Sequence, residues 1–277
     1  MSLINTLSSG VSALRTFTEG LNVIGNNISN INTTAYKASK TSYSDSFSDT
    51  LQASSPGSST AAIQIGSGVQ IAGVNINFGQ GSTVETGNTT DLAISGSGYF
   101  VVRDAANGSN FASRDGTFRF DTNGNLINTQ GYQVLDSAGA AVSIANCRDP
   151  LGNAITFANT SSVTIGTDGT LTAYDAAGTG YAGQKVGLLT VTSQSKLLKQ
   201  GNNLYDFSST GATLANDLGV AGTGSLGHIQ SGRLEQSNVD LTEQFTDMIT
   251  TQRSFQAASR LVTVSDTILE DIVSLKR

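Results

Sequence analysis

Residues 3–31 read LINTLSSGVSALRTFTEGLNVIGNNISNI, and their apolar side chains recur at alternating intervals of four and three positions. This spacing is a heptad pattern, which predicts one apolar stripe along an α-helix. Gly10 interrupts the stripe. Gly25 and the asparagines after it are poor helix formers, so the helix is expected to end near residue 32. The stripe comprises Leu3, Leu7, Leu14, Phe17, Leu21, Ile24 and Ile28.

The carboxyl end contains a second predicted helix. Neither Gly nor Pro occurs between Asn238 and Arg277. Asp240 and, three residues later, Glu243 form an approximate capping box at its start. Its apolar stripe comprises Leu241, Phe245, Met248, Phe255, Leu261, Ile268, Ile272 and Leu275.

The two helices are expected to pack on each other, because amphipathic segments bury their apolar stripes against a partner. A two-helix hairpin would still leave apolar surface exposed, which favours packing between many copies of the chain. The alternative interpretation is that each terminal helix packs only on its own domain.

Between the helices the sequence predicts β-structure. Short β-prone runs alternate with turn signals after Ile63, and Asp115-Gly116, Asn123-Gly124 and Asp168-Gly169 are each predicted to be hairpin turns. The fold class is therefore α+β, with a β-rich central domain flanked by long terminal helices that pair as a coiled-coil-like inner domain. The expected domains are a helical polymerisation domain over 1–32 and 238–277, an extended linker over 33–75 and a β-rich outer domain over 76–237.

Composition excludes several classes of function. The chain has 15 basic and 21 acidic side chains, a net charge of −6, so no basic surface for nucleic acid is expected. A single cysteine, Cys147, and a single histidine, His228, exclude a disulfide framework and a histidine-based zinc site. No cofactor or metal site is predicted. The sequence contains no apolar run long enough for a membrane span, and no cleavable secretory signal is expected.

One enzymatic alternative remains open from the residues. A β-rich chain with many carboxylates is also typical of carbohydrate-active enzymes and surface adhesins, and a glycosidase needs two carboxylates that converge in a cleft. Most of the candidate carboxylates lie at turn signals, and the terminal helices have no role in such an enzyme. The candidates are Asp91, Asp104, Asp115 and Asp121.

Several motifs resemble a known family. Residues 26–30 (NNISN) and 33–37 (TTAYK) resemble the amino-terminal signature of bacterial flagellar axial proteins, the rod and hook subunits. Ala35 replaces the usual glycine, which makes a positive backbone angle there less favourable. Residues 91–100 and 113–118 resemble the family's central strands. Residues that match the two terminal signatures are Asn26, Asn27, Asn30, Thr33, Lys37, Asn238, Asp240, Gln252 and Arg253.

The resemblance implies a non-enzymatic subunit of a tubular polymer, with the terminal helices inside and the β domain outside. It implies export by the flagellar type III apparatus without a cleaved signal. The expected partners are other copies of the chain and neighbouring axial proteins, namely rod, hook-cap and hook–filament junction proteins. The implied location is the flagellar hook or basal body. Residues 23–27 and 252–258 are more similar to hook proteins, whereas the length favours the distal rod. We expect a flexible, torque-transmitting hook subunit, with a distal-rod subunit as the alternative.

Overall fold

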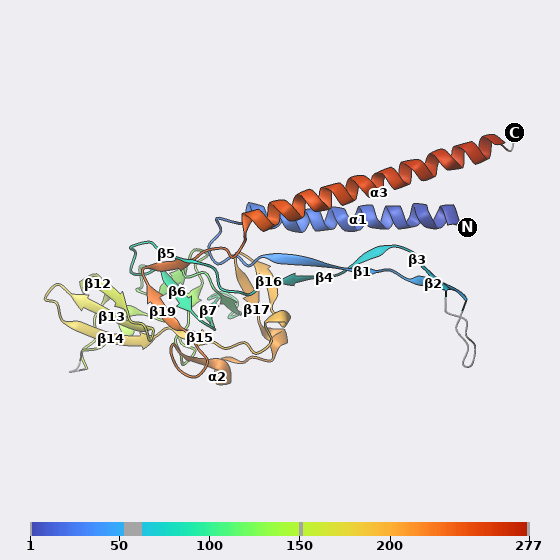
Figure 1. Ribbon diagram of the computed structural model, residues 1–277. Helices are drawn as coiled ribbons and strands as arrows, with labels where there is room; N and C mark the ends of the chain where they lie inside the picture. The colour runs from blue at the N-terminus through green and yellow to red at the C-terminus, as the bar shows by residue number, and fades with distance from the viewer. Residues whose placement is uncertain (1, 53–62, 150–151, 276–277) are drawn as a thin grey trace. The chain divides into compact units, whose positions relative to one another are not determined.

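The computed structural model describes residues 2–52, 63–149 and 152–275. The chain divides into two compact units: unit 1 is Met1–Ile31, Ala38–Asn77 and Val239–Arg277, and unit 2 is Asn32–Lys37 and Phe78–Asn238. Long helices belong to unit 1 and most strands to unit 2 (Figure 1). The predicted α+β class, with a β-rich centre between two long terminal helices, is confirmed.

Unit 1 consists of two helices and a long β-hairpin in the described part of the chain. Helices α1 and α3 lie side by side and antiparallel, and the hairpin runs along α1 (Figure 1). β1 pairs with β4 and β2 with β3, all antiparallel. The elements are α1 (Ser2–Ser29), β1 (Ser39–Asp45), β2 (Ser48–Gln52), β3 (Ile63–Gly66), β4 (Val69–Ile76) and α3 (Leu241–Leu275).

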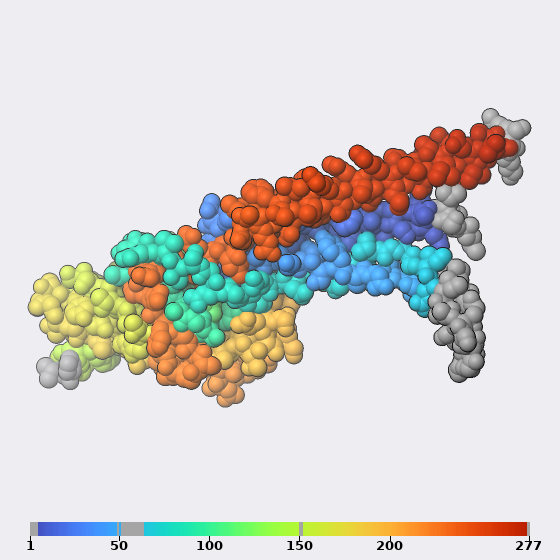
Figure 2. Space-filling view, viewed as in Figure 1, coloured from blue at the N-terminus to red at the C-terminus, as the bar shows by residue number. Residues whose placement is uncertain are grey.

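The hairpin contacts α1 through small residues of the helix, and Figure 2 shows α1 between α3 and the hairpin. The Thr16 hydroxyl donates to the carbonyl of Val69 at 3.2 Å, and the Val69 amide donates to the Ser12 hydroxyl at 3.3 Å. A Cβ on Gly20 would lie 2.3 Å from the hydroxyl of Tyr43. Small side chains on this face therefore let the hairpin approach the helix backbone.

This arrangement differs from the extended linker expected over 33–75. Residues 38–77 belong to the helical unit, and β1 and β4 form a ladder that begins at Ser39 opposite Ile76. The physical reason is that the Ser- and Thr-rich residues of β1 pair with a strand more than twenty residues away, and local composition carries no signal of that pairing. Residues 53–62 of the expected linker lie outside the described residues.

Unit 2 is built from short antiparallel strands. Its largest sheet has the order β16-β17-β8-β7-β11-β10-β9, with β15 joined to β7 and β18 joined to β15; β12-β13-β14 form a second sheet, and β19-β6 and β20-β5 are separate pairs. The strands are β5 (Thr83–Glu85), β6 (Leu92–Ser95), β7 (Tyr99–Arg103), β8 (Asn110–Ser113), β9 (Phe118–Phe120), β10 (Leu126–Asn128), β11 (Gln133–Val134), β12 (Thr160–Ile165), β13 (Thr170–Asp175), β14 (Gly180–Lys185), β15 (Gly187–Leu189), β16 (Leu198–Gly201), β17 (Leu204–Asp206), β18 (Leu218–Val220), β19 (His228–Ser231) and β20 (Arg233–Glu235). A short helix, α2 (Leu214–Asp217), and the 3₁₀ turns Ile144–Asn146, Phe157–Asn159, Gln194–Lys196 and Ser208–Thr210 connect them.

The core of unit 2 is fully enclosed. Its largest members, such as Phe100, Leu126 and Leu188, have no exposed surface, and Phe100 packs edge-on against Phe118 at 5.2 Å between ring centroids. Cys147 belongs to this core, and burial raises the pKa of its thiol to about 11. His228 lies on the surface.

Two of the three predicted hairpin turns are confirmed. Gly124 and Gly169 both have positive φ, at 76° and 81°, and connect β9 to β10 and β12 to β13. The prediction for Asp115-Gly116 is wrong, because β8 and β9 pair with other strands. Gly116 is required instead by a close backbone contact: its Cβ would lie 1.7 Å from the carbonyl oxygen of Leu92.

Candidate functional site

Helices α1 and α3 pack closely at Gly10. A Cβ there would lie 2.7 Å from a methyl group of Val262 and 3.3 Å from Leu261. The interruption of the apolar stripe is therefore a place where α3 comes close to the backbone of α1. Ile24 is buried, and the other stripe residues described on α1 are half-buried, namely Leu7, Leu14, Phe17, Leu21 and Ile28. Leu3 belongs to the first turn of α1, and its side chain lies outside the described residues.

Asn27 connects the three segments of unit 1 at one end of the helix pair. Its side-chain amide donates to the Ser39 carbonyl at 2.7 Å and to Gln244 Oε1 on α3 at 2.8 Å, and its Oδ1 accepts the Ser39 amide at 3.0 Å. Asn27 and Gln244 are both buried, so these bonds satisfy polar groups that could not reach water. This explains an asparagine at this signature position.

Helix α3 begins with the predicted cap. Asp240 Oδ1 accepts the amides of Thr242 at 2.8 Å and Glu243 at 3.4 Å. Glu243 forms an exposed ion pair with Lys40 at 3.2 Å. Asp240 therefore caps the helix as the capping-box spacing predicted, and the Glu243 side chain pairs with Lys40.

Helix α3 carries many apolar side chains that are exposed to water. Of the predicted stripe, Met248 and Phe255 are half-buried, whereas the remaining members are exposed by 40% to 86%. These exposed members are Leu241, Phe245, Leu261, Ile268, Ile272 and Leu275. Ile249, Val264 and Val273 extend the same surface and were not in the predicted set. Exposed apolar side chains in this number on one helix are typical of an interaction surface.

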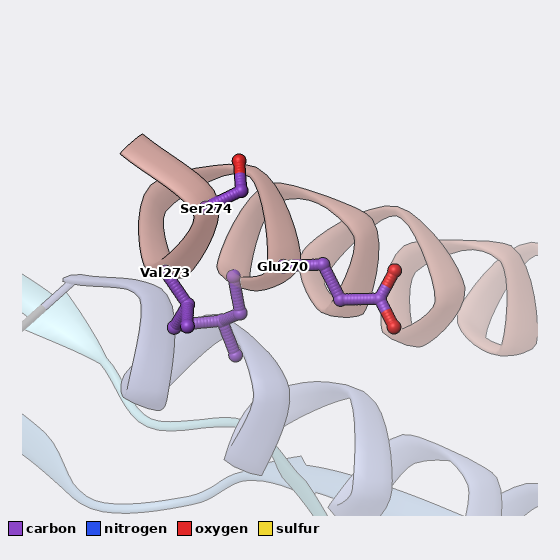
Figure 3. A pocket seen from close by; sticks show the side chains of 4 residues that line it. Glu270, Val273 and Ser274 are labelled. Atoms are coloured by element: carbon purple, nitrogen blue, oxygen red, sulfur yellow. The ribbon is translucent and has the colours of Figure 1, made fainter. Parts of the chain in front are cut away.

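This exposed surface has two parts. Leu241, Phe245 and Ile249 form the first, and the second begins at Leu261 and continues to Leu275. Gln252 and Arg253, which match the carboxyl-terminal signature, lie exposed between them. Near the end of α3 a hollow of about 500 Å³ is lined by Leu269, Glu270, Val273 and Ser274. Figure 3 shows Val273 on the side of α3 nearer α1 and Ser274 on the opposite side.

In unit 2, the signature residue Lys37 belongs to a buried cluster of charges. Its ammonium group lies 2.5 Å from Glu235 Oε1 and donates to the Gly79 carbonyl at 2.8 Å. Arg114 lies 3.4 Å from the other oxygen of Glu235, and the Gly81 amide donates to Oε1 at 3.0 Å. Burial lowers the pKa of Lys37, while the bond to Glu235 opposes that shift.

Aromatic rings surround this cluster. The Arg114 guanidinium lies 5.1 Å from the centre of the Tyr99 ring, and Tyr99 packs edge-on against Tyr205 at 6.4 Å. Burial raises the pKa of Tyr99 to about 12 and that of Tyr205 further. Lys37 was identified in the sequence as a signature residue. The sequence analysis did not identify Glu235, although a buried basic side chain requires an acidic partner.

The remaining signature residues hold the backbone around this cluster. Ala35 donates its amide to the Glu235 carbonyl at 2.8 Å, and its φ is 55°. Ala35 therefore adopts the positive angle that its side chain disfavours, and this hydrogen bond helps to hold the left-handed conformation. The Asn238 side chain donates to the Gly79 carbonyl at 2.9 Å. Thr33 accepts the Tyr36 amide through its carbonyl at 3.3 Å. In unit 1, Asn30 donates to the Asn26 side chain at 2.6 Å.

The carboxylates considered for an enzyme each stabilise a turn. Asp91 accepts from the Thr86 hydroxyl at 2.6 Å, Asp104 from the Ala106 amide at 2.9 Å, Asp115 from the Thr117 hydroxyl at 2.6 Å and Asp121 from the Asn123 side chain at 3.2 Å. Among the described residues, no three His, Cys, Asp or Glu side chains are grouped to hold a metal ion. Neither long helix, nor α2, contains a stretch apolar enough to cross a bilayer within the described ranges.

Comparison with known protein families gives three matches in chain order. Residues 7–37 match the flagella basal body rod protein family, residues 93–173 the flagellar hook protein FlgE/F/G D1 domain, and residues 230–275 the flagellar basal body rod FlgEFG protein C-terminal domain. The terminal matches cover the α1 and α3 signatures, and the central match covers β7 to β12 with most of β6 and β13.

Comparison with individual proteins extends these matches over the whole chain. The flagellar basal-body rod protein FlgG of Bacillus subtilis (strain 168) is 38% identical over 281 residues, covering 99% of this chain and 100% of the relative. FlgG of Agrobacterium fabrum is 35% identical and covers 89% of each chain. The flagellar hook protein FlgE of Helicobacter mustelae is 41% identical over 138 residues, which is 48% of this chain and 30% of the hook protein. Together with the helix pair and the signature residues described above, this similarity establishes that the chain belongs to the FlgE/F/G family of flagellar rod and hook proteins.

Proposed function

We propose that this chain is a structural subunit of the distal rod of the bacterial flagellum. The observation that carries the proposal is similarity over the full length to relatives named as basal-body rod proteins. A rod subunit is a non-enzymatic component that assembles with copies of itself and with adjacent axial proteins. The hook, the rod and the proteins that join them are its expected neighbours.

The hook remains the second candidate. A hook protein has higher identity, 41%, but only within 138 residues, and most of that relative has no counterpart here. The motifs that favoured the hook, at residues 23–27 and 252–258, lie within or beside the two terminal family matches. Full-length similarity to rod proteins therefore favours the alternative that the sequence length had indicated.

The exposed face of α3 supports assembly through the terminal helices. Residues such as Phe245, Leu261 and Ile268 are between 42% and 50% exposed in the single chain. Burying the exposed half of each such side chain against another subunit gains about 1 kcal/mol. The α1 stripe contributes less to such contacts, because α3 and the hairpin already cover much of it. We propose that α3 provides the greater part of the subunit interface.

Deletion of the gene distinguishes the rod from the hook. We expect cells without this protein to assemble a truncated rod that lacks both the distal segment and the hook, as seen by electron microscopy of isolated basal bodies. A complete rod with only the hook missing would contradict the proposal and would assign the chain to the hook. Complementation with the intact gene is the control.

A pair of neighbouring substitutions tests the α3 interface. Ile268→Asp places a carboxylate within the exposed apolar surface, whereas Thr267→Asp places the same charge on the adjacent exposed residue. Burying an unpaired carboxylate is strongly unfavourable. We expect Ile268→Asp to abolish assembly, measured by sedimentation and by rod formation in cells, and Thr267→Asp to retain it. Equal assembly by both variants would contradict an interface at this face.

A further inference from the structure

Phe47 is an aromatic side chain that is exposed to water on a hydrogen-bonded backbone. It is 82% exposed, and it follows Asp45 and Ser46 at the junction between β1 and β2. Its carbonyl accepts the Ser67 amide at 2.9 Å and also the Ser67 hydroxyl, and the preceding amide donates to the Gly68 carbonyl at 2.8 Å. The ring therefore projects from an ordered ladder.

The opposite strand at this point is fastened to α1. Gly68 has a φ of 135°, and a Cβ there would lie 2.3 Å from the Ser12 hydroxyl and 3.4 Å from the Cα of Ser9. The Val69 amide next to it donates to Ser12. Because the backbone of both strands is hydrogen-bonded here, a partner could cover the Phe47 ring without first having to order this part of the hairpin.

The same unit contains a groove of suitable chemistry between α1 and α3. It has a volume of about 410 Å³, and its described lining residues are all uncharged. Small side chains leave the hollow beside the close contact at Gly10, while one aromatic ring and one leucine give it an apolar wall. The lining residues are Ser9, Gly10, Ala13, Phe17, Ser254, Ala257, Ala258 and Leu261.

We propose that Phe47 of one subunit inserts into the α1–α3 groove of a second copy of this chain. Its own groove is not the site, because Phe47 is 82% exposed in the single chain. A neighbouring hollow of about 550 Å³ between α1 and β4 is less suitable, since Arg15 and Glu19 line it and would lose water. The inference rests on the proposed function, in which copies assemble with each other.

Continuity with the exposed face of α3 supports a second copy as the occupant. Leu261 lines the groove and also begins the second exposed apolar part of α3. The ring and the groove are different surfaces of one subunit, so the contact is heterologous. A heterologous contact that does not close into a ring produces an open helical assembly. Each copy thus inserts its Phe47 side chain into one neighbour and accepts the Phe47 side chain of another in its own groove.

The first test measures assembly. We expect Phe47→Ser, and separately Ala257→Phe, which fills the groove, to raise the concentration needed for assembly by about tenfold or more. Leu198→Ser is the control, because it removes an exposed leucine, 54% accessible, from β16 in unit 2. Circular dichroism of each variant checks that the fold is retained. Assembly of Phe47→Ser at the wild-type concentration would overturn the inference.

The second test identifies the contact directly. In a Cys147→Ala background, Phe47→Cys and Ala257→Cys chains are mixed and oxidised, and disulfides are identified by mass spectrometry. We expect a 47–257 disulfide between chains at least tenfold above the 198–257 product of a Leu198→Cys control. Equal yields would overturn the inference. If Phe47→Ser assembles normally while Ile268→Asp does not, this contact fails and the proposed function stands. If Ile268→Asp also assembles normally, the α3 interface fails as well.

Discussion

Unit 2 buries its apolar side chains almost completely, whereas unit 1 leaves many of its own in contact with water. Phe100, Leu126 and Leu188 in unit 2 have no exposed surface, while Phe245 and Ile268 on α3 are 50% and 42% exposed. Both units contain Phe, Leu and Ile side chains, so amino-acid composition alone does not tell which unit leaves them exposed. The difference is that unit 2 encloses its own core, and unit 1 has a face that other copies can cover.

The ion pairs of the two units differ in burial in the same way as the apolar side chains. The Lys37–Glu235 pair in unit 2 has side chains exposed by 1% and 0%, and the Lys40–Glu243 pair in unit 1 by 73% and 56%. A buried charge that loses its partner is strongly destabilising, whereas an exposed pair contributes little. The following substitutions test this contrast, beginning with the largest expected effect.

Glu235→Gln should destabilise unit 2 by about 3–5 kcal/mol, because it leaves the Lys37 and Arg114 cations buried beside a neutral amide. Glu243→Gln, the matched change in the exposed pair, should cost less than about 1 kcal/mol. Urea unfolding followed by near-ultraviolet circular dichroism of the tyrosines measures both. Similar losses in the two variants would remove the contrast between buried and exposed charges.

Gly10→Ala should weaken the helix pair by about 1–3 kcal/mol, because its Cβ would lie 2.7 Å from Val262. Gly25→Ala in the same helix meets no atom within 4 Å and should stabilise α1 by about 0.5–1 kcal/mol. Thermal unfolding of the helical signal at 222 nm compares the two. A stabilising effect at both positions would show that the helices do not pack closely at Gly10.

Because of Cys147, the free energy of unfolding of unit 2 should fall as the pH becomes alkaline. Its folded-state pKa of about 11 exceeds the ordinary value of 9.0, so the unfolded chain releases its proton first as pH rises. The contribution is complete below pH 9.0 and is lost progressively towards pH 11. The wild type should lose about 1 kcal/mol more than Cys147→Ala between pH 8 and pH 10. Parallel urea titrations at the two pH values measure this difference, and identical pH dependence would contradict it.

Ala35→Gly has the smallest expected effect, a gain of up to about 1 kcal/mol. The φ of 55° is unfavourable for alanine and neutral for glycine, while the lost methyl group and the freer unfolded chain offset part of the gain. Differential scanning calorimetry should show a slightly higher transition temperature. A clear loss of stability would mean that packing of the Ala35 methyl group outweighs the backbone strain.

The parts of the fold that depend on local pattern could be predicted from the sequence. The heptad spacing gave α1, and Asp240 with the run free of Gly and Pro gave the start and extent of α3. The hairpin β1–β4 could not be found this way, because Ser39 pairs with Ile76 far along the chain. The positive angle of Ala35 could not be found for a similar reason, since a hydrogen bond to a distant strand helps to hold it.

The sequence predicted many of the residues of the candidate site but not which of them are exposed. Leu261 and Ile268 were in the predicted stripe, but periodicity alone did not separate the α3 face that covers α1 from the exposed one. Val264 and Ile249 were missed because one helix carries both faces. Phe47 is not part of any periodic apolar pattern in the sequence. Only the structure shows that it is exposed and that the backbone around it is hydrogen-bonded.

The Lys37–Glu235 pair joins residues 198 positions apart, and this separation determines the order of folding. Contacts between distant residues form late, because a long loop must close before they gain energy. Most of the polypeptide must therefore be present before Lys37 can pair with Glu235. A chain that stops before residue 235 lacks both Glu235 and α3. Such a chain can complete neither the charge cluster nor the pair of long helices.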